Sequence, residues 1–400
     1  MIGALSSFRR IMIAFTVFCI AIIAPIVVIT AFFALELFAG LKPSRSRAML
    51  KANPRTAIVI PAHDEEAVIG RTIADLLEAG GHSLLLVVAD NCNDQTAALA
   101  KQAGATVLTR KDPERRGKGF ALAAARDALR MDPPDVVVVL DADCRLDGRC
   151  LRSLSAAAAL SQRACQAVNL LAPDLSAPAV VQISNFAFMI KNLTRQRGLQ
   201  RLARRAHLTG TGMALPWSVF ADADLGGSNI VEDLALGLDL ADRALPPRLI
   251  EDATVWSPPA SAKGTLVQRR RWEGGYIATS LKRAPGALFR SVATLDLRGF
   301  VAALDLSVPP LALLFVLNAL AFLLGVVIAV VDGPRWPVIT QTATALAAAA
   351  GLTIAWICEG RRFVSGTTLL SLPFYVLWKL PIYLGFIRTG SPKEWLRSGR

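Results

Sequence analysis

The stretch VVVVLDADC, residues 136–144, decides the fold that we expect of this sequence. Its first five residues are apolar without polar alternation, and they run directly into Asp141 and Asp143. Such an unbroken apolar run is typical of a strand buried on both faces, as in a parallel sheet. Because ligands of open α/β sheets bind beyond the carboxyl ends of the strands, we expect the two aspartates at a binding site.

The surrounding sequence alternates in the same way between apolar runs and helical spacing. Further strands are predicted at residues 56–60, 84–89 and 105–108, and helices at residues 64–79, 94–103 and 119–131. This alternation builds a parallel sheet with right-handed crossovers. Polar clusters at residues 61–66, 90–94 and 141–143 follow three of the strands and would meet at one sheet edge. Each cluster alone would also suit a helix cap or a turn.

Composition favours a membrane partner over nucleic acid. Hydrophobic residues make up 53% of the 400 residues, and 44 Lys and Arg against 31 Asp and Glu give a formal charge of +13. Basic residues gather beside membrane spans on the cytoplasmic side, and no nucleic-acid reader motif is present. The six cysteines form no CxxC pair and no Cys/His cluster along the sequence, so neither zinc nor a disulfide framework is predicted.

Three apolar runs are long enough to cross a bilayer, at residues 11–39, 308–331 and 338–357. The first is too long for the apolar region of a signal peptide, so an uncleaved helix is favoured. More basic residues follow it than precede it, which places the next segment in the cytoplasm. A fourth run at residues 363–387 is interrupted by Pro373, Lys379 and Pro381, and either a further span or a re-entrant segment would fit it.

These runs divide the chain into five predicted regions. They are a membrane helix in residues 1–40, an α/β domain in 52–285, interfacial helices in 286–306, a membrane region in 307–387 and a basic cytoplasmic tail in 388–400. We therefore expect a multi-pass protein of the inner (plasma) membrane with its α/β domain in the cytoplasm. A basic run at Arg195, Arg197, Arg201, Arg204 and Arg205 has near-helical spacing and is interpreted as a solvated or membrane-facing helix.

The paired aspartates after the central strand suit a hard divalent cation. Mg²⁺ or Mn²⁺ prefers oxygen ligands and typically binds one or two carboxylates together with phosphate oxygens. The sequence has no GxxxxGK[ST] loop and no GxGxxG after its first strand, which argues against a P-loop hydrolase and a Rossmann dinucleotide site. A metal-bridged nucleotide-sugar fits what remains.

Five motifs occur in the order found in family 2 glycosyltransferases. They are PAHDEE at 61–66, Asp90, the Asp141-x-Asp143 pair, Glu232-Asp233 and QRRRW at 268–272. The combination resembles the membrane-embedded branch that contains the cellulose, hyaluronan and poly-N-acetylglucosamine synthases. It implies a GT-A-like α/β domain, the fold of nucleotide-diphospho-sugar transferases, with flanking transmembrane helices. Asp64 departs from the pattern, because the first motif more often carries Asn there.

The resemblance implies a donor site for a UDP-sugar. Asp90 would receive the uracil or ribose, and Pro61, His63 and Glu65 would line the nucleoside side. Asp141 and Asp143 would hold Mg²⁺ or Mn²⁺, and Lys118 would bring charge to the phosphates. Lys118 would equally fit a solvated helix start.

On the acceptor side, the resemblance makes Asp233 the base that deprotonates the acceptor hydroxyl, so that in-line displacement inverts the anomeric carbon. An acidic helix start is the alternative interpretation of Glu232-Asp233. The residues expected around the diphosphate and acceptor are Gln268, Arg271, Trp272, Gly210 and Gly212. The arginines would also suit anionic lipid headgroups, and the glycines an ordinary turn.

The expected function is an inverting, metal-dependent hexosyltransferase that extends a β-linked exopolysaccharide or capsule from a UDP-sugar. The alternative is a non-processive enzyme that adds one sugar to a lipid or polyprenyl-linked acceptor, because a few helices make a slender channel for a polymer. A non-catalytic scaffold would have no need of the carboxylates and QxxRW together. The expected partners are a UDP-sugar, a saccharide or glycolipid acceptor and the bilayer, with no nucleic acid.

Overall fold

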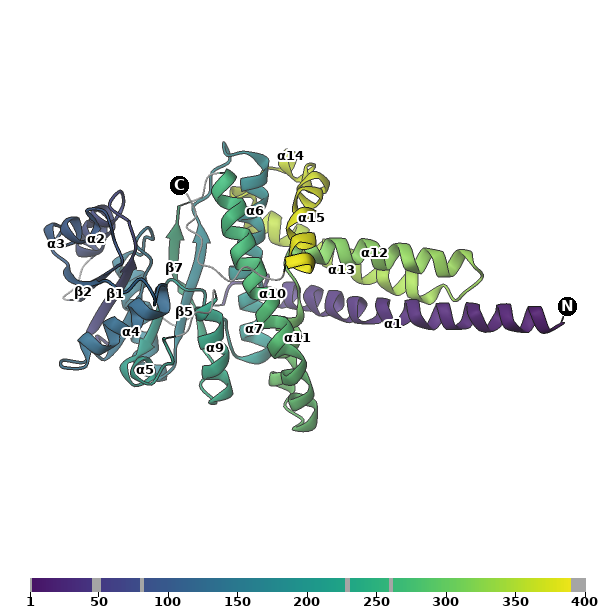
Figure 1. The fold of residues 1–400 in the computed structure, drawn as a ribbon, viewed down its shortest axis with the longest axis horizontal. Helices are drawn as coiled ribbons and strands as arrows, with labels where there is room; N and C mark the ends of the chain where they lie inside the picture. Colours follow the sequence, from purple (N-terminus) through teal and green to yellow (C-terminus); the bar gives the residue numbers. More distant parts are fainter. Residues whose placement is uncertain (1, 45–51, 80–82, 227–230, 259–261, 390–400) are drawn as a thin grey trace.

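The computed structural model describes residues 2–44, 52–79, 83–226, 231–258 and 262–389, and places an α/β domain at one end of a long helical bundle (Figure 1). The domain contains a seven-stranded sheet of order β3-β2-β1-β4-β6-β5-β7. Its strands are β1 (Thr56–Ala62), β2 (Leu84–Asp90), β3 (Thr106–Arg110), β4 (Val136–Val139), β5 (Cys165–Leu171), β6 (Met213–Pro216) and β7 (Arg248–Ser257).

The four strands predicted from apolar runs form the parallel half of the sheet, and that prediction is confirmed. β1 lies between β2 and β4, and β3 pairs with the outer edge of β2, all parallel. The four valines of β4 are fully buried. Val136 and Val138 pack in a core with α2 (Ile69–Glu78) and α5 (Gly148–Ser161). Val137 and Val139 pack on the other face with α4 (Lys118–Leu129) and α9 (Glu232–Asp242). An unbroken apolar run is what a strand covered on both faces requires.

The helices of this half are α2 (Ile69–Glu78), α3 (Thr96–Gln102), α4 (Lys118–Leu129) and α5 (Gly148–Ser161). Of the three helices predicted in this half, α2 and α3 begin later than their patterns predict, whereas α4 begins one residue earlier. The acidic residues 64–66 precede α2 in a loop instead of forming its first turn. This leaves the polar clusters at the sheet edge free to line a site.

The second half of the sheet is mixed. β6 runs antiparallel to both β4 and β5, and β7 pairs in parallel with β5. Two short helices complete this half, α8 (Trp217–Ala221) and α9 (Glu232–Asp242). The result is an α/β sheet whose parallel strands all end toward one cavity.

Three helices in the described part of the chain are long and apolar enough to cross a membrane, as predicted. They are α1 (Ile2–Gly40), α12 (Leu311–Val330) and α13 (Trp336–Cys358), which lie side by side (Figure 1). Cys19 and Ile23 of α1 pack on Ala321 and Ile328 of α12. Deeper in the bundle, the Asn318 side chain contacts both Thr30 Oγ1 at 3.1 Å and Gln341 Nε2 at 2.6 Å. Side chains of the three helices therefore contact one another directly.

The fourth apolar run breaks into short elements. These are a 3₁₀ turn (Gly360–Arg362), α14 (Gly366–Leu369) and α15 (Leu372–Thr389). The apolar part of α15, Leu372–Phe386, is shorter than the three candidate spans.

A layer of helices separates the sheet from the bundle. It contains α6 (Ala179–Met189), a π-helical turn (Ile190–Arg195), α7 (Gln196–Ala203), α10 (Ala262–Ala293) and α11 (Leu297–Ser307). In Figure 1, α10 and α11 run across the long axis of the bundle. The predicted domain boundary at residue 285 falls inside α10, which continues to Ala293.

The prediction of a solvated or membrane-facing basic helix is wrong for Arg195 and Arg197, which are both buried. Arg195 donates from Nε to Glu36 and from Nη2 to Asp305, both at 2.6 Å. Arg197 likewise pairs with two acidic residues, Glu251 and Glu359. The acidic partners lie on α1, α11, β7 and the end of α13 and are far away in the sequence, so the basic run alone gave no sign of them. These ion pairs tie the membrane helices to the α/β domain.

Candidate active site

One cavity of about 1370 Å³ begins where β1, β2 and β4 end and extends to the start of α12. The predicted site residues that line it are Pro61, His63, Glu65, Asp90, Lys118, Asp141, Asp143, Gly210, Asp233, Gln268, Arg271 and Trp272. Residues from seven separate segments of the chain therefore meet in one place.

Gly212 is not among the residues that line this cavity. Its φ is +65°, and an added Cβ would lie 2.5 Å from Cγ2 of Val255 and 3.1 Å from Cβ of Ala167. Its backbone N–H donates to the carbonyl of Val139 at 2.9 Å. A glycine is therefore needed here for close packing within the sheet.

Asp90 is fixed at the end of β2, where it lines the cavity and only 6% of its surface is exposed. Its Oδ1 accepts from Arg110 Nη1 at 2.6 Å and from Asn91 Nδ2 at 3.0 Å. Arg110 is also paired with Asp112 at 2.9 Å. The sequence analysis missed Arg110, although a charged residue that ends the strand beside Asp90 was a usable signal, because the two are register partners.

The loops after β1 and β2 hold each other through their acidic side chains. Asp64 Oδ1 accepts from Asn93 N at 2.8 Å, and Asp94 Oδ2 accepts from Glu66 N at 3.1 Å. The φ of Asp64 is +52°, in the left-handed region that Asn and Asp tolerate best among residues with a side chain. Asp64 can therefore adopt the backbone conformation that the more usual Asn would have at this position.

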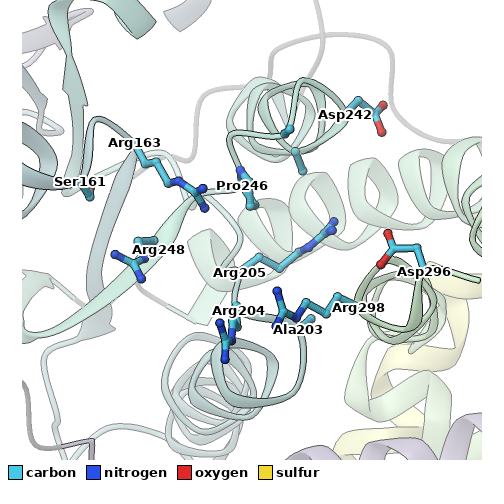
Figure 2. A pocket seen from close by; sticks show the side chains of 12 residues that line it. Ser161, Arg163, Ala203, Arg204, Arg205, Asp242, Pro246, Arg248, Asp296 and Arg298 are labelled. Atoms are coloured by element: carbon cyan, nitrogen blue, oxygen red, sulfur yellow. The ribbon is translucent and has the colours of Figure 1, made fainter.

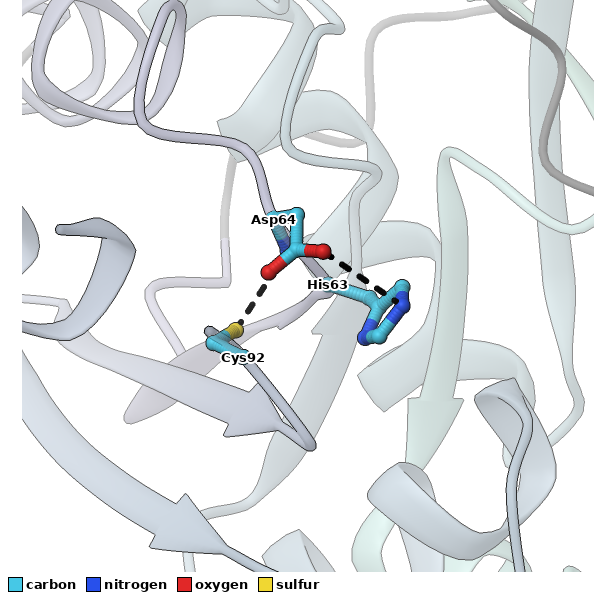
Figure 3. A group of neighbouring side chains, drawn as sticks. All are labelled: His63, Asp64 and Cys92. Carbon is cyan, nitrogen blue, oxygen red and sulfur yellow. Dashed lines mark hydrogen bonds and ion pairs between the residues drawn. The ribbon is translucent and has the colours of Figure 1, made fainter. Parts of the chain in front are cut away.

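His63, Asp64 and Cys92 form a cluster beside these loops, which Figure 3 shows. No Cys/His cluster was predicted, because the two residues come from different strand ends. His63 Nδ1 lies 2.7 Å from the carbonyl of Asp90, and Asp64 N donates to Cys92 Sγ at 3.4 Å. Burial raises the pKa of Cys92, so its thiol stays protonated at neutral pH. Because His63 and Cys92 both contact the backbone of these loops, we assign the cluster to loop structure.

Asp141 and Asp143 present hard oxygen donors to the cavity just beyond β4. The ammonium of Lys118 pairs with Asp141 and donates to the carbonyl of Gly210 at 2.7 Å. Burial lowers the pKa of Lys118, but Asp141, Glu232 and Asp233 outweigh that effect, and the pKa is raised. The position thus already attracts a cation, and its donor set fits Mg²⁺ or Mn²⁺.

Asp233 lies in the first turn of α9, facing the same cavity. Burial raises the pKa of Asp233, and burial together with the Asp233 charge raises the pKa of Glu232 to about 7. A carboxyl whose pKa approaches neutrality is suited to accept a proton in a transition state. Gly210, with φ +84°, leaves space for another molecule to reach Asp233, since an added Cβ would lie 3.1 Å from Asp233 Oδ2.

The QRRRW segment lies on α10 and faces the cavity with Gln268, Arg271 and Trp272. Trp272 stacks on Phe188 of α6 with ring centroids 5.5 Å apart. Burial lowers the pKa of Arg271, while the charges of Glu232, Asp141 and Asp233 act against that effect. Arg271 therefore faces the acidic side of the site across the cavity.

The membrane end of the cavity contains residues that no motif indicated. Lys191 Nζ lies 4.8 Å above the ring of Tyr276, and burial lowers the pKa of this lysine. The wall is completed at the start of α12 by Val308, Pro309 and Pro310. Lys191 stands in an otherwise apolar stretch, and only the fold places it beside Asp233.

Residues 54–275 match the family described as "Glycosyltransferase like family 2". The chain belongs to this family. Among curated proteins it is 33% identical over 86 residues to Uncharacterized protein MJ1222 of Methanocaldococcus jannaschii, a match that covers 22% of this chain and 34% of that protein. This family 2 glycosyltransferase thus spans about a third of the length of the curated relative.

Of two solved structures that match this glycosyltransferase, one has a TM-score above 0.5 and the other a TM-score below it. The mannosyltransferase PcManGT of Pyrobaculum calidifontis, in complex with GDP-Man and Mn²⁺, has a TM-score of 0.55 at 16% identity, covering 94% of this chain and 98% of that one. Glucosyl-3-phosphoglycerate synthase of Mycobacterium tuberculosis has a TM-score of 0.39 at 18% identity, covering 60% and 86%. The family match and the sheet confirm the predicted GT-A-like fold with flanking apolar helices.

Proposed function

We propose that this family 2 glycosyltransferase moves a single hexose from a nucleoside diphosphate sugar to a lipid-linked acceptor at the membrane surface. The observation that carries the proposal is the shape of the cavity. It connects the acidic sheet edge with Val308, Pro309 and Pro310, which precede the α12 span. A lipid held in the bilayer can present its polar head at that end without leaving the membrane.

The donor would bind at the sheet edge. Asp90 is held in place by Arg110 and can accept hydrogen bonds from a base or ribose. Asp141 and Asp143 would hold Mg²⁺ or Mn²⁺, which when bound neutralises charge on the diphosphate leaving group. Lys118 and Arg271 bring further positive charge to opposite sides of the same space.

Asp233 would act as the base. Its raised pKa and its position beside Gly210 suit removal of a proton from an acceptor hydroxyl. The hydroxyl oxygen would then attack the anomeric carbon on the face opposite the diphosphate, and the linkage would be inverted. Lys118 stabilises the ionised form of Asp233 before the proton is taken up.

Packing in the bundle favours a lipid acceptor over the polysaccharide predicted from the motifs. A polymer synthase of the cellulose or hyaluronan type needs a passage between its spans. Here the facing side chains of α1, α12 and α13 contact one another through apolar residues and through Asn318. These contacts occupy the space that a chain of sugars would need.

We propose further that the α/β domain faces the cytoplasm of a cell with the protein in its inner membrane. The basic excess after α1 supports this orientation. In this orientation the nucleoside diphosphate sugar would enter the site from the cytoplasm. UDP is the first candidate nucleotide, because the motifs resemble those of enzymes that use UDP-sugars.

The test uses the full chain, purified in detergent with Mn²⁺ and a panel of radiolabelled UDP- and GDP-sugars. Polyprenyl phosphate, diacylglycerol and ceramide are offered as acceptors, and products are separated by chromatography and sized. We expect one sugar added to one lipid class, with transfer slower by about 100-fold or more when Asp233→Asn replaces the wild type. A ladder of growing saccharide would overturn the lipid proposal. Release of free labelled sugar with no labelled lipid would count against transfer to any of these acceptors.

A further inference from the structure

A second cavity, of about 620 Å³, lies outside the candidate active site and gathers five arginines (Figure 2). The five are Arg163, Arg204, Arg205, Arg248 and Arg298, and we call this site the arginine pocket. They come from the turn after α5, the end of α7, the start of β7 and the start of α11. Two aspartates, Asp242 and Asp296, also line it.

The protein neutralises the positive charge of the arginine pocket only in part. None of the five guanidinium groups forms an ion pair with an acidic side chain in the described ranges. Asp242 is already engaged by Arg283 at 3.0 Å and Arg290 at 3.3 Å. Five arginines therefore face two aspartates, one of which is shared with cations outside the pocket.

Arg205 supplies the most specific sign of a missing partner. Its Nε is buried and has no hydrogen-bond partner among the described residues. Burial lowers the pKa of Arg205, and Asp296 and Asp242 offset only part of this effect. Leaving a buried N–H without an acceptor is unfavourable. An anion in the pocket would supply that acceptor.

Exposed apolar residues lie next to the pocket wall in the sequence, and we call them the apolar rim. Asp296 and Arg298 in the pocket wall alternate with Leu295 and Leu297, which are 90% and 73% exposed. Phe289, on the preceding turns of α10, is 79% exposed. These side chains lie at the junction of α10 and α11, the two helices that cross the bundle axis in Figure 1. The apolar rim and the basic pocket together would bind a molecule that has an acyl chain at one end and an anionic group at the other.

We propose that the arginine pocket binds the phosphate of an anionic phospholipid headgroup at the membrane surface. Arginine forks suit a phosphate oxygen pair, and the exposed leucines beside them enter the acyl region. The pocket lies at the last turn of α9, whereas Asp233 lies in its first turn, so the site is separate from the reaction cavity. The lipid would hold α10 and α11 against the bilayer.

The test measures lipid binding to the full chain by native mass spectrometry, with phosphatidylglycerol, glycerol phosphate and inorganic phosphate as separate probes. The pocket variant is Arg204→Gln/Arg298→Gln, both exposed residues. The matched control is Arg149→Gln/Arg152→Gln, also exposed, on the first turns of α5. We expect the pocket variant to lose roughly tenfold or more in affinity for phosphatidylglycerol, and the control to bind as wild type.

A second variant separates a lipid from a free phosphate. Leu295→Ser/Leu297→Ser should weaken phosphatidylglycerol binding while leaving glycerol phosphate binding unchanged. The proposal is overturned if pocket and control variants bind the lipid equally, or if wild type binds inorganic phosphate as tightly as the lipid. No sugar donor is present in these measurements, so their outcome is independent of the proposed transfer reaction.

Discussion

Glu232 and Asp233 begin α9 as neighbours inside the cavity, and burial raises the pKa of both carboxyls. Only Asp233 lies against Gly210, where an acceptor hydroxyl can approach. The pair differs in this way from an ordinary acidic helix start, in which the carboxylates are solvated and their role is to complement the helix dipole.

Replacing Asp233 by Asn should remove the base without removing the donor site. We expect kcat to fall by about 100-fold or more, while the dissociation constant for the nucleoside diphosphate stays within about threefold of wild type. Radiometric transfer assays and calorimetric nucleotide titration measure the two quantities. Asp224→Asn, an exposed change of the same kind, is the control. Equal turnover of both variants would rule out Asp233 as the base.

Glu232→Gln should stabilise the protein at alkaline pH. The pKa of Glu232 rises from 4.5 to about 7 on folding, so its contribution to stability is present below pH 4.5 and is lost as pH rises through 7. Glutamine does not titrate and avoids this loss. We expect a higher melting temperature than wild type near pH 9 and a small difference near pH 5, measured by thermal unfolding in detergent. A constant offset at both pH values would contradict the assignment.

Gly210→Ala should slow transfer without unfolding the domain. An L residue at φ +84° is strained, and its Cβ would lie 3.1 Å from Asp233 Oδ2. We expect kcat to fall by at least about tenfold, with a smaller change in donor KM. Gly70→Ala on α2, where a Cβ meets no atom within 4 Å, is the matched control and should leave kcat unchanged. Comparable kinetics for the two variants would show that the acceptor hydroxyl does not need a glycine at position 210 to reach Asp233.

At the scale of elements, the helix layer between sheet and bundle is held by buried charge. Arg195 joins Glu36 on α1 to Asp305 on α11, and His207 also contacts Asp305. Truncating one member of such a network leaves charges without a partner, which costs more than the pair itself contributes.

Arg195→Met should therefore destabilise the protein by about 3–5 kcal/mol. The methionine fills part of the space but leaves Glu36 and Asp305 without their shared cation. The free energy of unfolding in detergent, from denaturant titration, gives the comparison. Arg152→Met on the exposed face of α5 should change it little. If both variants unfold at the same denaturant concentration, the buried ion pairs do not hold this layer together.

The apolar runs of β1, β2 and β4 were sufficient to predict the parallel half of the sheet. β6 and β7 escaped notice because a four-residue strand and a strand with a register shift lack a clear period. In the site, three acidic motifs were found because each follows an apolar strand, and Glu232-Asp233 was found from the family resemblance. Lys191 and the partners of Arg195 were missed because contacts between residues far apart in the sequence leave no local pattern, whereas Arg110 could have been found from its place beside Asp90 in the sheet.

For the whole molecule, the proposed orientation places the α12–α13 turn on the opposite side of the membrane from the sheet. In a Cys358→Ser background, which removes the exposed native thiol, Arg335→Cys should react with an impermeant maleimide in intact cells. Arg130→Cys in the α/β domain should react only after lysis. Labelling in the reverse pattern would invert the topology and contradict a cytoplasmic donor site.

During synthesis, α1 enters the membrane long before its charge partners exist. Arg195 follows Glu36 by 159 residues, and Asp305 follows Arg195 by a further 110. At typical translation speeds the ribosome needs on the order of 10 to 30 seconds to reach Arg195. Until then a carboxyl group sits in the apolar helix without a counter-ion, a costly arrangement in lipid. A nascent chain stalled in this interval carries an incomplete anchor, which is the form that membrane quality-control proteases and insertion chaperones would encounter.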